Sequence, residues 1–335
     1  MYSLLRELLF LLSPEMSHHT ALRALKLAYQ LGLNGKAESL VGTPVEVMGL
    51  KFPNRVGLAA GLDKNAEFID ALASCGFGFI EVGTVTPRPQ PGNPHPRLFR
   101  LKSAKAIINR MGFNNHGLEY LLGQVHKAQY QGILGINIGK NFDTAVERAA
   151  DDYLIGLRKV YTHAHYITIN ISSPNTPGLR SLQYGEDLRR LLVALKQEQI
   201  LLAAEHSRYV PLAVKVAPDL SPEEIAGIAE VLLDCEMDGL IATNTTLDKS
   251  AVAQLDYGAE QGGLSGGPLT ERSTEVIRLF HQHLGTRIPI IGVGGIMSAQ
   301  DAVAKLQAGA ALVQIYTGFI YAGPTLIKDC VQACD

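Results

Sequence analysis

The sequence predicts an α/β protein, a (β/α)8 TIM barrel with an N-terminal extension of two helices. Short apolar runs that end in small or polar residues recur along the chain, and segments of helical periodicity lie between them. Continuous apolar strands that alternate with helices form a parallel sheet covered on both faces. Eight such units in about 280 residues favour a closed barrel over an open doubly wound sheet, although the length alone would also fit two average domains.

The first 36 residues form a separate unit in this prediction. Residues 2–12 are rich in leucine and predict a first helix, and Ser13-Pro14-Glu15 is a start signal for a second. Four basic and two acidic side chains give the unit a charge of +2 without its histidines. Two such amphipathic helices can lie in a membrane interface or pack on the barrel wall, and the pattern alone leaves both open.

The barrel unit spans residues 45–335. Residues 45–54 predict a small hairpin that closes the N-terminal end of the barrel. The predicted barrel strands are Val56–Gly61, Phe79–Thr84, Gly132–Gly139, Tyr166–Ser172, Leu212–Ala217, Gly239–Thr245, Pro289–Gly295 and Leu312–Gly318. The predicted helices are Asn65–Cys75, Gly117–Gln129, Ala145–Val160, Gly185–Ala204, Pro222–Leu233, Thr270–Leu284 and Ala299–Ala308, with Ser221 and Ser298 as N-caps.

Residues 85–112 interrupt this repeat as a long polar loop rich in proline. Long loops in compact domains are usually functional. This one follows the second predicted strand, on the face where barrel active sites form.

Composition restricts the class of protein. The formal charge of −2 gives no reason to expect nucleic acid as a partner. The four cysteines show no metal-binding spacing and suit a reducing compartment. No run of 18 apolar residues predicts a membrane-spanning helix, and no signal-peptide cleavage pattern follows the apolar N-terminus.

The most unusual segment is Asn170–Gly178, which reads N-I-S-S-P-N-T-P-G and follows the fourth predicted strand. Prolines fix the backbone, and asparagine and serine offer donors and acceptors. The segment therefore predicts a rigid polar pocket for a small planar ligand, in which Ser172 or Ser173 can move a proton.

Other polar residues also occupy predicted strand ends. Asn137, Asn170 and Asn244 end three strands, although asparagine is disfavoured in strands. Lys64 follows the first strand, and Lys215 lies inside an apolar run, where an ammonium needs an electron-rich partner. This repetition predicts a ligand with several carbonyl and N–H groups.

Glycines predict a phosphate site at the same end of the barrel. Gly262–Gly267 follows the sixth unit, Gly292–Ile296 ends the seventh strand, and Tyr316–Gly318 ends the eighth. Barrels often bind phosphate with the loops after strands 7 and 8. Flavin mononucleotide (FMN) fits this pattern, because its ring benefits from positive charge such as that of Lys215. No metal site is expected, and no pair of carboxylates indicates glycosidase chemistry.

Together these motifs resemble the quinone-dependent class (class 2) of dihydroorotate dehydrogenases, of bacterial type. The resemblance rests on the runs G-L-A-A-G-L-D-K (57–64), E-V-G-T-V-T-P-R-P-Q-P-G-N (81–93), N-R-M-G-F-N-N (109–115), G-I-N-I-G-K-N (135–141), Asn170–Gly178, I-A-T-N-T-T (241–246), G-G-L-S-G (262–266) and I-G-V-G-G-I (291–296). It covers the chain from about residue 45 to the end and extends to the helix pair.

The resemblance implies oxidation of (S)-dihydroorotate to orotate in pyrimidine (UMP) biosynthesis, with one FMN per chain. It implies Ser173 as the base that removes the C5 proton while hydride leaves C6, and Thr176 with a water is a hypothetical outlet for that proton. The implied substrate-binding residues are Lys64, Asn109, Arg110, Met111, Gly112, Phe113, Asn170, Asn175, Asn244 and Thr245. The implied FMN-binding residues are Ala60, Gly61, Leu62, Asp63, Lys64, Thr84, Asn137, Asn170, Lys215, Thr243, Gly266, Gly295, Tyr316 and Thr317.

For the helix pair of residues 1–36, the resemblance implies peripheral contact with the cytoplasmic side of the cell membrane and a tunnel for ubiquinone or menaquinone. It also implies a monomer.

The alternative functions are those of an α-hydroxy-acid oxidase, a soluble fumarate-type dihydroorotate dehydrogenase or a barrel that only binds phosphate ligands. The first needs a catalytic histidine, but His163 and His165 precede the fourth strand. The soluble class uses cysteine as its base and lacks the helix pair, and mere binding leaves Lys215 unexplained.

Overall fold

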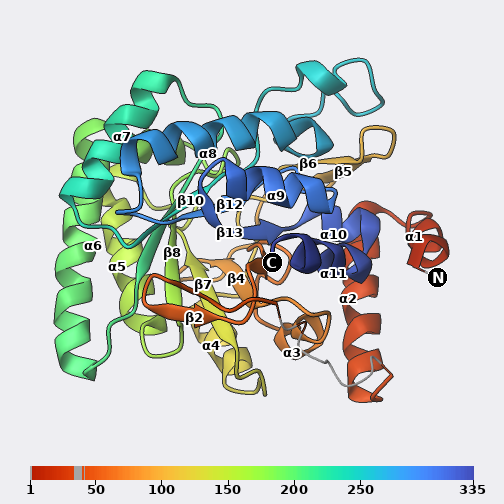
Figure 1. Ribbon diagram of the computed structural model, residues 1–335, viewed down its shortest axis with the longest axis horizontal. Helices are drawn as coiled ribbons and strands as arrows, with labels where there is room; N and C mark the ends of the chain where they lie inside the picture. Colours follow the sequence, from red (N-terminus) through yellow and green to blue (C-terminus); the bar gives the residue numbers. More distant parts are fainter. Residues whose placement is uncertain (1, 34–39, 41) are drawn as a thin grey trace.

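A computed structural model describes residues 2–33, 40 and 42–335. Within these residues eight parallel strands close into a barrel (Figure 1). In order around the barrel they are β3 (Val56–Leu58), β4 (Phe79–Val85), β7 (Ile133–Ile138), β8 (Tyr166–Asn170), β9 (Leu212–Val216), β10 (Gly239–Ala242), β12 (Ile290–Val293) and β13 (Ala310–Ile315), and β13 pairs with β3. Each predicted strand region is confirmed, with ends that differ by a few residues.

Helices surround the barrel. The predicted helices correspond to α3 (Ile69–Ala73), α4 (Leu118–Val125), α5 (Ala149–Val160), α6 (Gly185–His206), α7 (Pro222–Asp234), α8 (Thr270–Leu284) and α9 (Ala299–Gln307), whereas α10 (Thr317–Ala322) and α11 (Pro324–Ala333) were not predicted. Short 3₁₀ turns lie at η1 (Val146–Arg148), η2 (Leu179–Gln183), η3 (Ser250–Val252) and η4 (Gly267–Leu269). The caps are confirmed: the hydroxyl of Ser221 accepts from Glu224 N at 3.2 Å, and that of Ser298 from Asp301 N at 3.3 Å.

The predicted start of the first barrel helix at Asn65 was wrong, because α3 begins only at Ile69. Ala66 has a φ of +62°, which a right-handed helix does not allow. The carboxylate of Asp63 accepts the backbone N–H groups of Glu67 and Phe68 instead.

A hairpin of β1 (Val45–Val47) and β2 (Leu50–Phe52) closes the N-terminal end of the barrel, as predicted. Phe52 and Val47 are buried, and the Phe52 ring meets the ring of Phe79 edge to face at 5.0 Å. Phe79 and Tyr166 are the first residues of their strands, so the hairpin packs against the barrel end opposite to the predicted site.

The prediction of a long loop over residues 85–112 was wrong in its second half. β5 (Leu98–Leu101) and β6 (Ala106–Asn109) form an antiparallel hairpin, and β6 also pairs with β11 (Gly263–Gly266). Phe99 and Leu101 are buried in a small core with Ile108, whereas Arg100 faces away from it. This alternation has the period of a strand, and the prolines before it obscured the signal.

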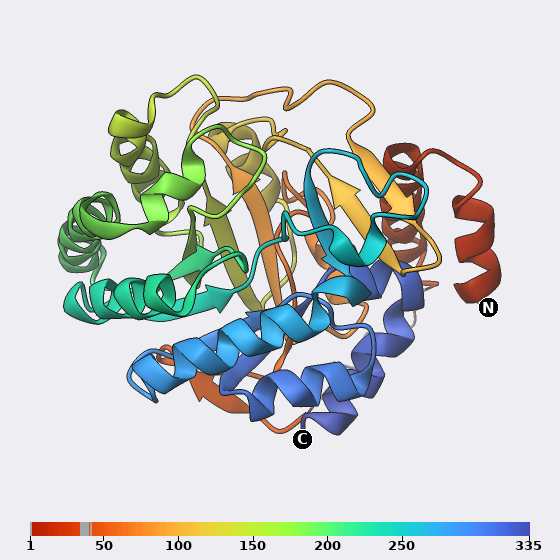
Figure 2. The same ribbon diagram turned by 90° about the horizontal axis from the view of Figure 1, so that it is seen from above.

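The two predicted N-terminal helices are confirmed as α1 (Tyr2–Leu9) and α2 (Pro14–Gln30). They lie on one side of the barrel next to the β5–β6 hairpin (Figure 2). Met1 and residues 34–36 of the predicted 1–36 unit lie outside the described residues. None of the helices in the described part of the chain combines the length and the apolar character needed to cross a membrane.

Candidate active site

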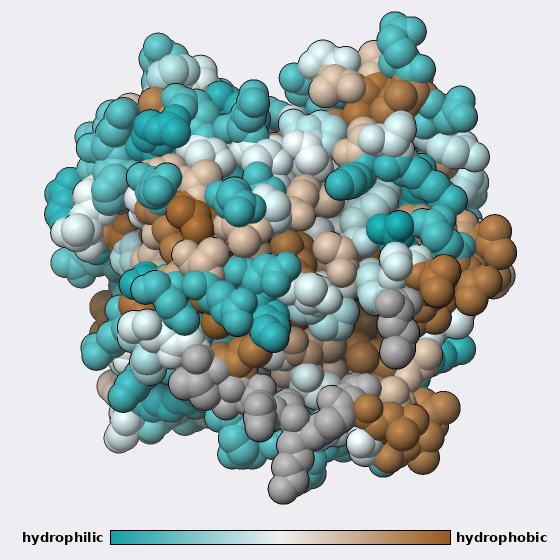
Figure 3. All heavy atoms as spheres, turned by 45° about the vertical axis from the view of Figure 1, so that its right-hand side comes forward, coloured by the Kyte–Doolittle hydropathy of each residue, from teal (hydrophilic) through white to brown (hydrophobic). Residues whose placement is uncertain are grey.

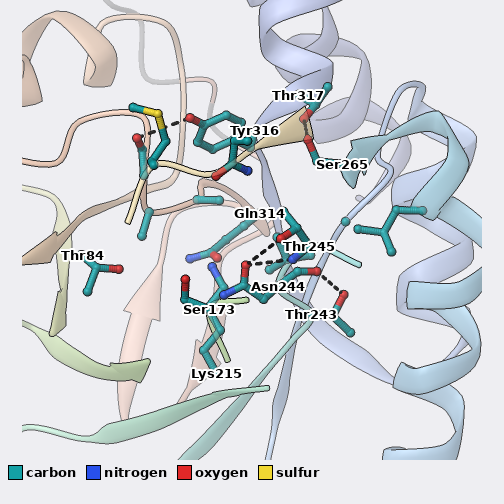
Figure 4. Close-up of a pocket in the computed structure, with 18 of the residues that line it drawn as sticks. Thr84, Ser173, Lys215, Thr243, Asn244, Thr245, Ser265, Gln314, Tyr316 and Thr317 are labelled. Carbon is teal, nitrogen blue, oxygen red and sulfur yellow. Dashed lines mark hydrogen bonds between the residues drawn. The ribbon is translucent and has the colours of Figure 1, made fainter. Parts of the chain in front are cut away.

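A cavity of about 980 Å³, partly open to solvent, lies at the C-terminal ends of the barrel strands (Figure 4). Most residues that the sequence singled out line it, although they lie far apart in the sequence. They are Ala60, Gly61, Lys64, Thr84, Asn109, Met111, Gly112, Phe113, Asn170, Ser173, Asn175, Lys215, Thr243, Asn244, Thr245, Gly266, Gly295, Tyr316 and Thr317. The barrel therefore brings these side chains and backbone groups together at one end.

Four of the predicted site residues do not line this cavity. Arg110 forms a salt bridge with Glu260 at 2.7 Å, and Leu62 lines a second cavity described below. Asp63 is buried, which raises the pKa of its carboxyl to about 6, and it accepts backbone N–H groups before α3. Asn137 is fully buried below the cavity.

Polar side chains next to the cavity surround the fully buried carboxylate of Glu81, and one of them, Gln314, lines the cavity. This carboxylate accepts hydrogen bonds from Asn137 Nδ2 at 2.8 Å, Tyr166 Oη at 2.8 Å and Gln314 Nε2 at 2.7 Å. Sequence reasoning missed Glu81 and Gln314. The signal was present, because each is a polar residue inside an apolar strand, like Lys215.

Lys215 brings a buried cation to the cavity from β9 (Figure 4). Its side chain is 5% exposed, and its ammonium has no hydrogen bond or salt bridge within the described residues. Burial lowers the pKa of Lys215, and the negative charge of Glu81 opposes this. A buried ammonium without a direct partner is costly, so this part of the cavity fits an electron-rich group.

Asparagine side chains at neighbouring strand ends are joined by hydrogen bonds. Asn170 Nδ2 donates to Thr84 Oγ1 at 2.9 Å and to Asn137 Oδ1 at 3.1 Å, and Thr84 Oγ1 donates to the same Asn137 oxygen at 2.5 Å. These bonds link β4, β7 and β8, and they hold Asn170 and Thr84 at the cavity wall. The asparagines that recur at strand ends in the sequence thus belong to one hydrogen-bonded network.

The two serines of the segment Asn170–Gly178 have different surroundings. Ser172 is fully buried, donates to Asn170 Oδ1 at 3.2 Å and accepts from Asn244 Nδ2 at 3.0 Å. Ser173 lines the cavity, and its hydroxyl accepts the backbone N–H of Asn175 at 3.3 Å. Ser173 is therefore the serine whose hydroxyl a ligand can reach.

The predicted phosphate region lacks space for side chains. A Cβ atom on Gly266 would lie 2.3 Å from a backbone oxygen, and one on Gly295 would lie 2.4 Å from a Cα atom. Both glycines also have positive φ, +95° and +70°. Beside them Thr317 Oγ1 donates to Ser265 Oγ at 2.9 Å. The hydroxyls and close backbone approach suit an anion such as a phosphate. Ser265 was missed, although it lies within the glycine-rich Gly262–Gly267 run.

A second cavity, of about 700 Å³, lies between α1, α2 and the barrel. Its lining is largely apolar and includes Phe10, and it shares Tyr316 with the first cavity. Arg100 contributes a guanidinium whose buried Nη1 has no hydrogen-bond partner in the described residues. Burial lowers the pKa of His18 to about 3, so its imidazole is neutral near pH 7. The sequence alone did not identify this lining, because leucines that line a cavity and leucines in a packed core follow the same sequence pattern.

Comparisons with known proteins agree with this arrangement. The family model described as "Dihydroorotate dehydrogenase" matches residues 43–334. The chain is 60% identical over 334 residues to a "Dihydroorotate dehydrogenase (quinone)" of Azotobacter vinelandii, covering 99% of this chain and 96% of the relative. It is also 60% identical over 336 residues to the protein of that name from Pseudomonas fluorescens SBW25, covering 99% and 98%.

Solved structures agree as well. The crystal structure of DHODH from Eimeria tenella in complex with ferulenol superposes with a TM-score of 0.87 at 38% identity, covering 96% of this chain and 90% of that chain. The ligand-free form gives 0.85 at 39% identity, covering 94% and 93%. The match extends over nearly the whole chain, helix pair included, and the chain therefore belongs to the dihydroorotate dehydrogenase family.

Proposed function

We propose that this protein oxidises (S)-dihydroorotate to orotate in pyrimidine biosynthesis and delivers the electrons to a membrane quinone. Relatives that are 60% identical over nearly their full length carry the name dihydroorotate dehydrogenase (quinone). The observation that carries the proposal is that two unlike cavities share Tyr316 in their linings, one with many polar side chains and one largely apolar. The cavity with many polar side chains suits a polar substrate, and the largely apolar cavity suits an apolar electron acceptor.

The first cavity fits one FMN per chain. Within the described part of the chain, the ammonium of Lys215 lacks a direct partner and the Oε1 atom of Gln314 is buried without a hydrogen bond, and the glycine cradle excludes Cβ atoms. Lys215 and Thr243 would hold the ring, while Gly266, Gly295 and Thr317 would hold the phosphate. When bound, FMN supplies the acceptor for hydride and the route by which electrons reach the quinone.

Dihydroorotate would bind among the amides at the cavity mouth. Asn175 Nδ2 donates to Asn109 Oδ1 at 3.3 Å, so these two side chains orient each other while keeping further donors and acceptors for the ligand. Lys64 donates to Gly61 O at 3.0 Å and lines the cavity. Its ammonium would pair with the substrate carboxylate, and burial lowers its pKa to about 8.

Ser173 is the proposed base. Its hydroxyl takes the proton from C5 while hydride leaves C6, and the two losses create the C5=C6 double bond of orotate. A hydroxyl is a weak base, so the proton must move on. Thr176 is 4% exposed and its Oγ1 has no hydrogen-bond partner in the described part of the chain, so it remains available for a relay with water.

The helix pair is the proposed membrane contact, on the cytoplasmic side. Leu4, Leu5, Leu8 and Leu11 of the α1 region are 52–81% exposed, and Met16, Leu27, Leu31 and Leu33 also face outward. Apolar side chains gather on this side of the molecule (Figure 3). Exposed apolar surface of this kind marks an interaction site, and a lipid surface would give ubiquinone or menaquinone direct access to the cavity beneath. The proposal takes the enzyme to be a monomer.

A spectrum of the purified protein tests the proposed function. The protein should be yellow, its visible flavin absorbance should bleach anaerobically on addition of dihydroorotate, and a short-chain quinone should restore it. Colourless protein that takes up no FMN, or a flavin that dihydroorotate leaves oxidised, would refute the proposal.

Lipid vesicles test the membrane part separately. Replacing Leu4, Leu8 and Leu11 by serine removes exposed apolar side chains, so the variant should co-sediment less with vesicles while dihydroorotate still bleaches its flavin. Equal sedimentation of both proteins would refute the membrane assignment. Size-exclusion chromatography in detergent checks the monomer.

A further inference from the structure

Arg97, in the segment before β5, joins the N-terminal helices to the loop over the active site. It is 7% exposed. Its Nη2 and Nε atoms donate to the Glu15 carboxylate of α2 at 2.7 and 3.1 Å. Its Nη1 atom donates to the carbonyl oxygens of Pro91 and Asn93 at 2.6 and 3.0 Å. One guanidinium thus binds the Glu15 carboxylate and the two loop carbonyls at the same time.

The segment that Arg97 holds is bonded in turn to the strand end that lines the cavity. Arg97 O accepts from Arg110 N at 2.9 Å, and Asn93 N donates to Met111 O at 3.1 Å. Asn93 Nδ2 donates to Arg110 O at 2.9 Å and reaches Asn175 O at 3.5 Å. Met111 and Asn175 both line the cavity.

This contact between the two segments is closely packed. A Cβ atom on Gly92 would lie 2.2 Å from Met111 O, and one on Gly112 would lie 2.9 Å from the Asn93 side chain. Movement of residues 91–97 therefore has to move residues 109–113 as well. By this route the helix pair is connected to the substrate side of the first cavity. It also covers the second, largely apolar cavity.

Glu15 also balances the positive charge at the cavity mouth. Burial opposes ionisation of Glu15, but the hydrogen bonds and charge of Arg97 outweigh it and hold the pKa of Glu15 below its usual value. Glu15 in turn supports the charge of Lys64, whose pKa burial lowers. Without Glu15, the buried Arg97 would face no carboxylate, and it would be drawn toward water and away from the carbonyls of residues 91 and 93.

We propose that Glu15 is a positioning residue for dihydroorotate: through Arg97 it holds residues 109–113 in their binding conformation and so couples the membrane-facing helices to the substrate site. This inference rests on the proposed function. It implies that a change in the seating of α2 alters substrate affinity even where no quinone is present.

Orotate binding to the full-length holoprotein tests the coupling, because a ligand next to flavin perturbs its absorbance. Glu15→Gln should weaken orotate binding about tenfold and raise the KM for dihydroorotate more than it lowers kcat. Flavin content and the KM for quinone should stay at wild-type values. Glu7→Gln is the matched control, because Glu7 is a carboxylate of the same helix pair whose salt bridge among the described residues is to Arg6 and not to the loop.

Two further variants keep the test decisive. Arg97→Lys retains the charge but cannot reach Glu15 and both carbonyls together, so orotate binding should weaken as in Glu15→Gln. In an Arg97→Gln background, Glu15→Gln should have no further effect on orotate binding. Orotate affinity within twofold of wild type in both Glu15→Gln and Arg97→Lys would overturn the coupling. A wild-type protein whose flavin responds neither to orotate nor to dihydroorotate would instead overturn the proposed function, and the coupling with it.

Discussion

The side-chain amide of Asn244 donates a hydrogen bond to the hydroxyl of Ser172 at 3.0 Å, and Ser172 donates to Asn170 Oδ1 at 3.2 Å. Ser172 is fully buried by these contacts. Its neighbour Ser173 keeps its hydroxyl at the cavity. The proposal that Ser173 is the base, which the residue types alone left open between the two serines and the resemblance implied, is thus supported by the geometry.

Replacing each serine by alanine separates their roles. Ser173→Ala should slow bleaching of the flavin by dihydroorotate about 10²- to 10⁴-fold, which is the usual contribution of a general base. Ser172→Ala removes a hydrogen bond that orients Asn170 and Asn244, so a fall of about tenfold is expected. Anaerobic stopped-flow absorbance measures both rates. A larger loss for Ser172→Ala would contradict the assignment.

Thr176→Val tests the proton outlet. Its hydroxyl is buried without a hydrogen-bond partner among the described residues, and removing it should slow flavin reduction about 10- to 100-fold if the proton of Ser173 passes through it. Thr168→Val is a matched control, because Thr168 is also buried with a hydroxyl that has no partner among the described residues, but it lies within β8, before the segment that holds Ser173. Rates equal to wild type in Thr176→Val would remove Thr176 from the relay.

Lys215→Met tests the buried cation. Loss of the ammonium should reduce the rate of flavin bleaching about 10²- to 10³-fold, because preorganised charge in a buried site is a large part of catalysis. Thermal stability of the FMN-free protein should not fall, since Lys215 has no hydrogen bond or salt bridge to lose within the described residues. Stopped-flow absorbance of the holoprotein and a thermal melt of the FMN-free protein measure the two effects. A normal rate, or a large drop in the Tm of the FMN-free protein, would contradict this role.

The sequence predicted those features that depend on a local pattern of residues, and it did not predict those that depend on contacts between distant residues. Barrel strands are buried on both faces, so their apolar runs are visible without partners. Glu81 was missed because its three hydrogen-bond donors come from three other strands. The contact of Glu15 with Arg97 spans 82 positions, and no local pattern indicates it. Single polar residues inside apolar strands were the available signal, and Lys215 was the one that sequence reasoning used.

Lys305 lies on α9 and is fully buried close to the predicted phosphate region. Its ammonium donates to Ser273 Oγ at 2.7 Å and to Thr274 Oγ1 at 3.1 Å, and Ser273 Oγ donates to Gly294 O at 2.8 Å. Burial lowers the pKa of Lys305 to about 7, and the nearby charge of Asp301 opposes this only in part. The folded protein thus releases this proton at a lower pH than the unfolded chain does.

The stability of the protein should therefore depend on pH through Lys305. Between the lowered pKa and the ordinary value of a lysine, the unfolded chain binds more protons, so folding becomes more favourable as pH rises. Burial of the protonated Lys305 therefore destabilises the folded protein fully below about pH 7, and this destabilisation disappears at high pH. Relative to Lys305→Met, wild type should gain roughly 2 kcal/mol of unfolding free energy between pH 7 and 9. Denaturant unfolding at both pH values measures it, with Lys328→Met as a control for loss of an exposed charge. A Lys305→Met difference that matches the control at both pH values would mean that Lys305 keeps its proton throughout this range.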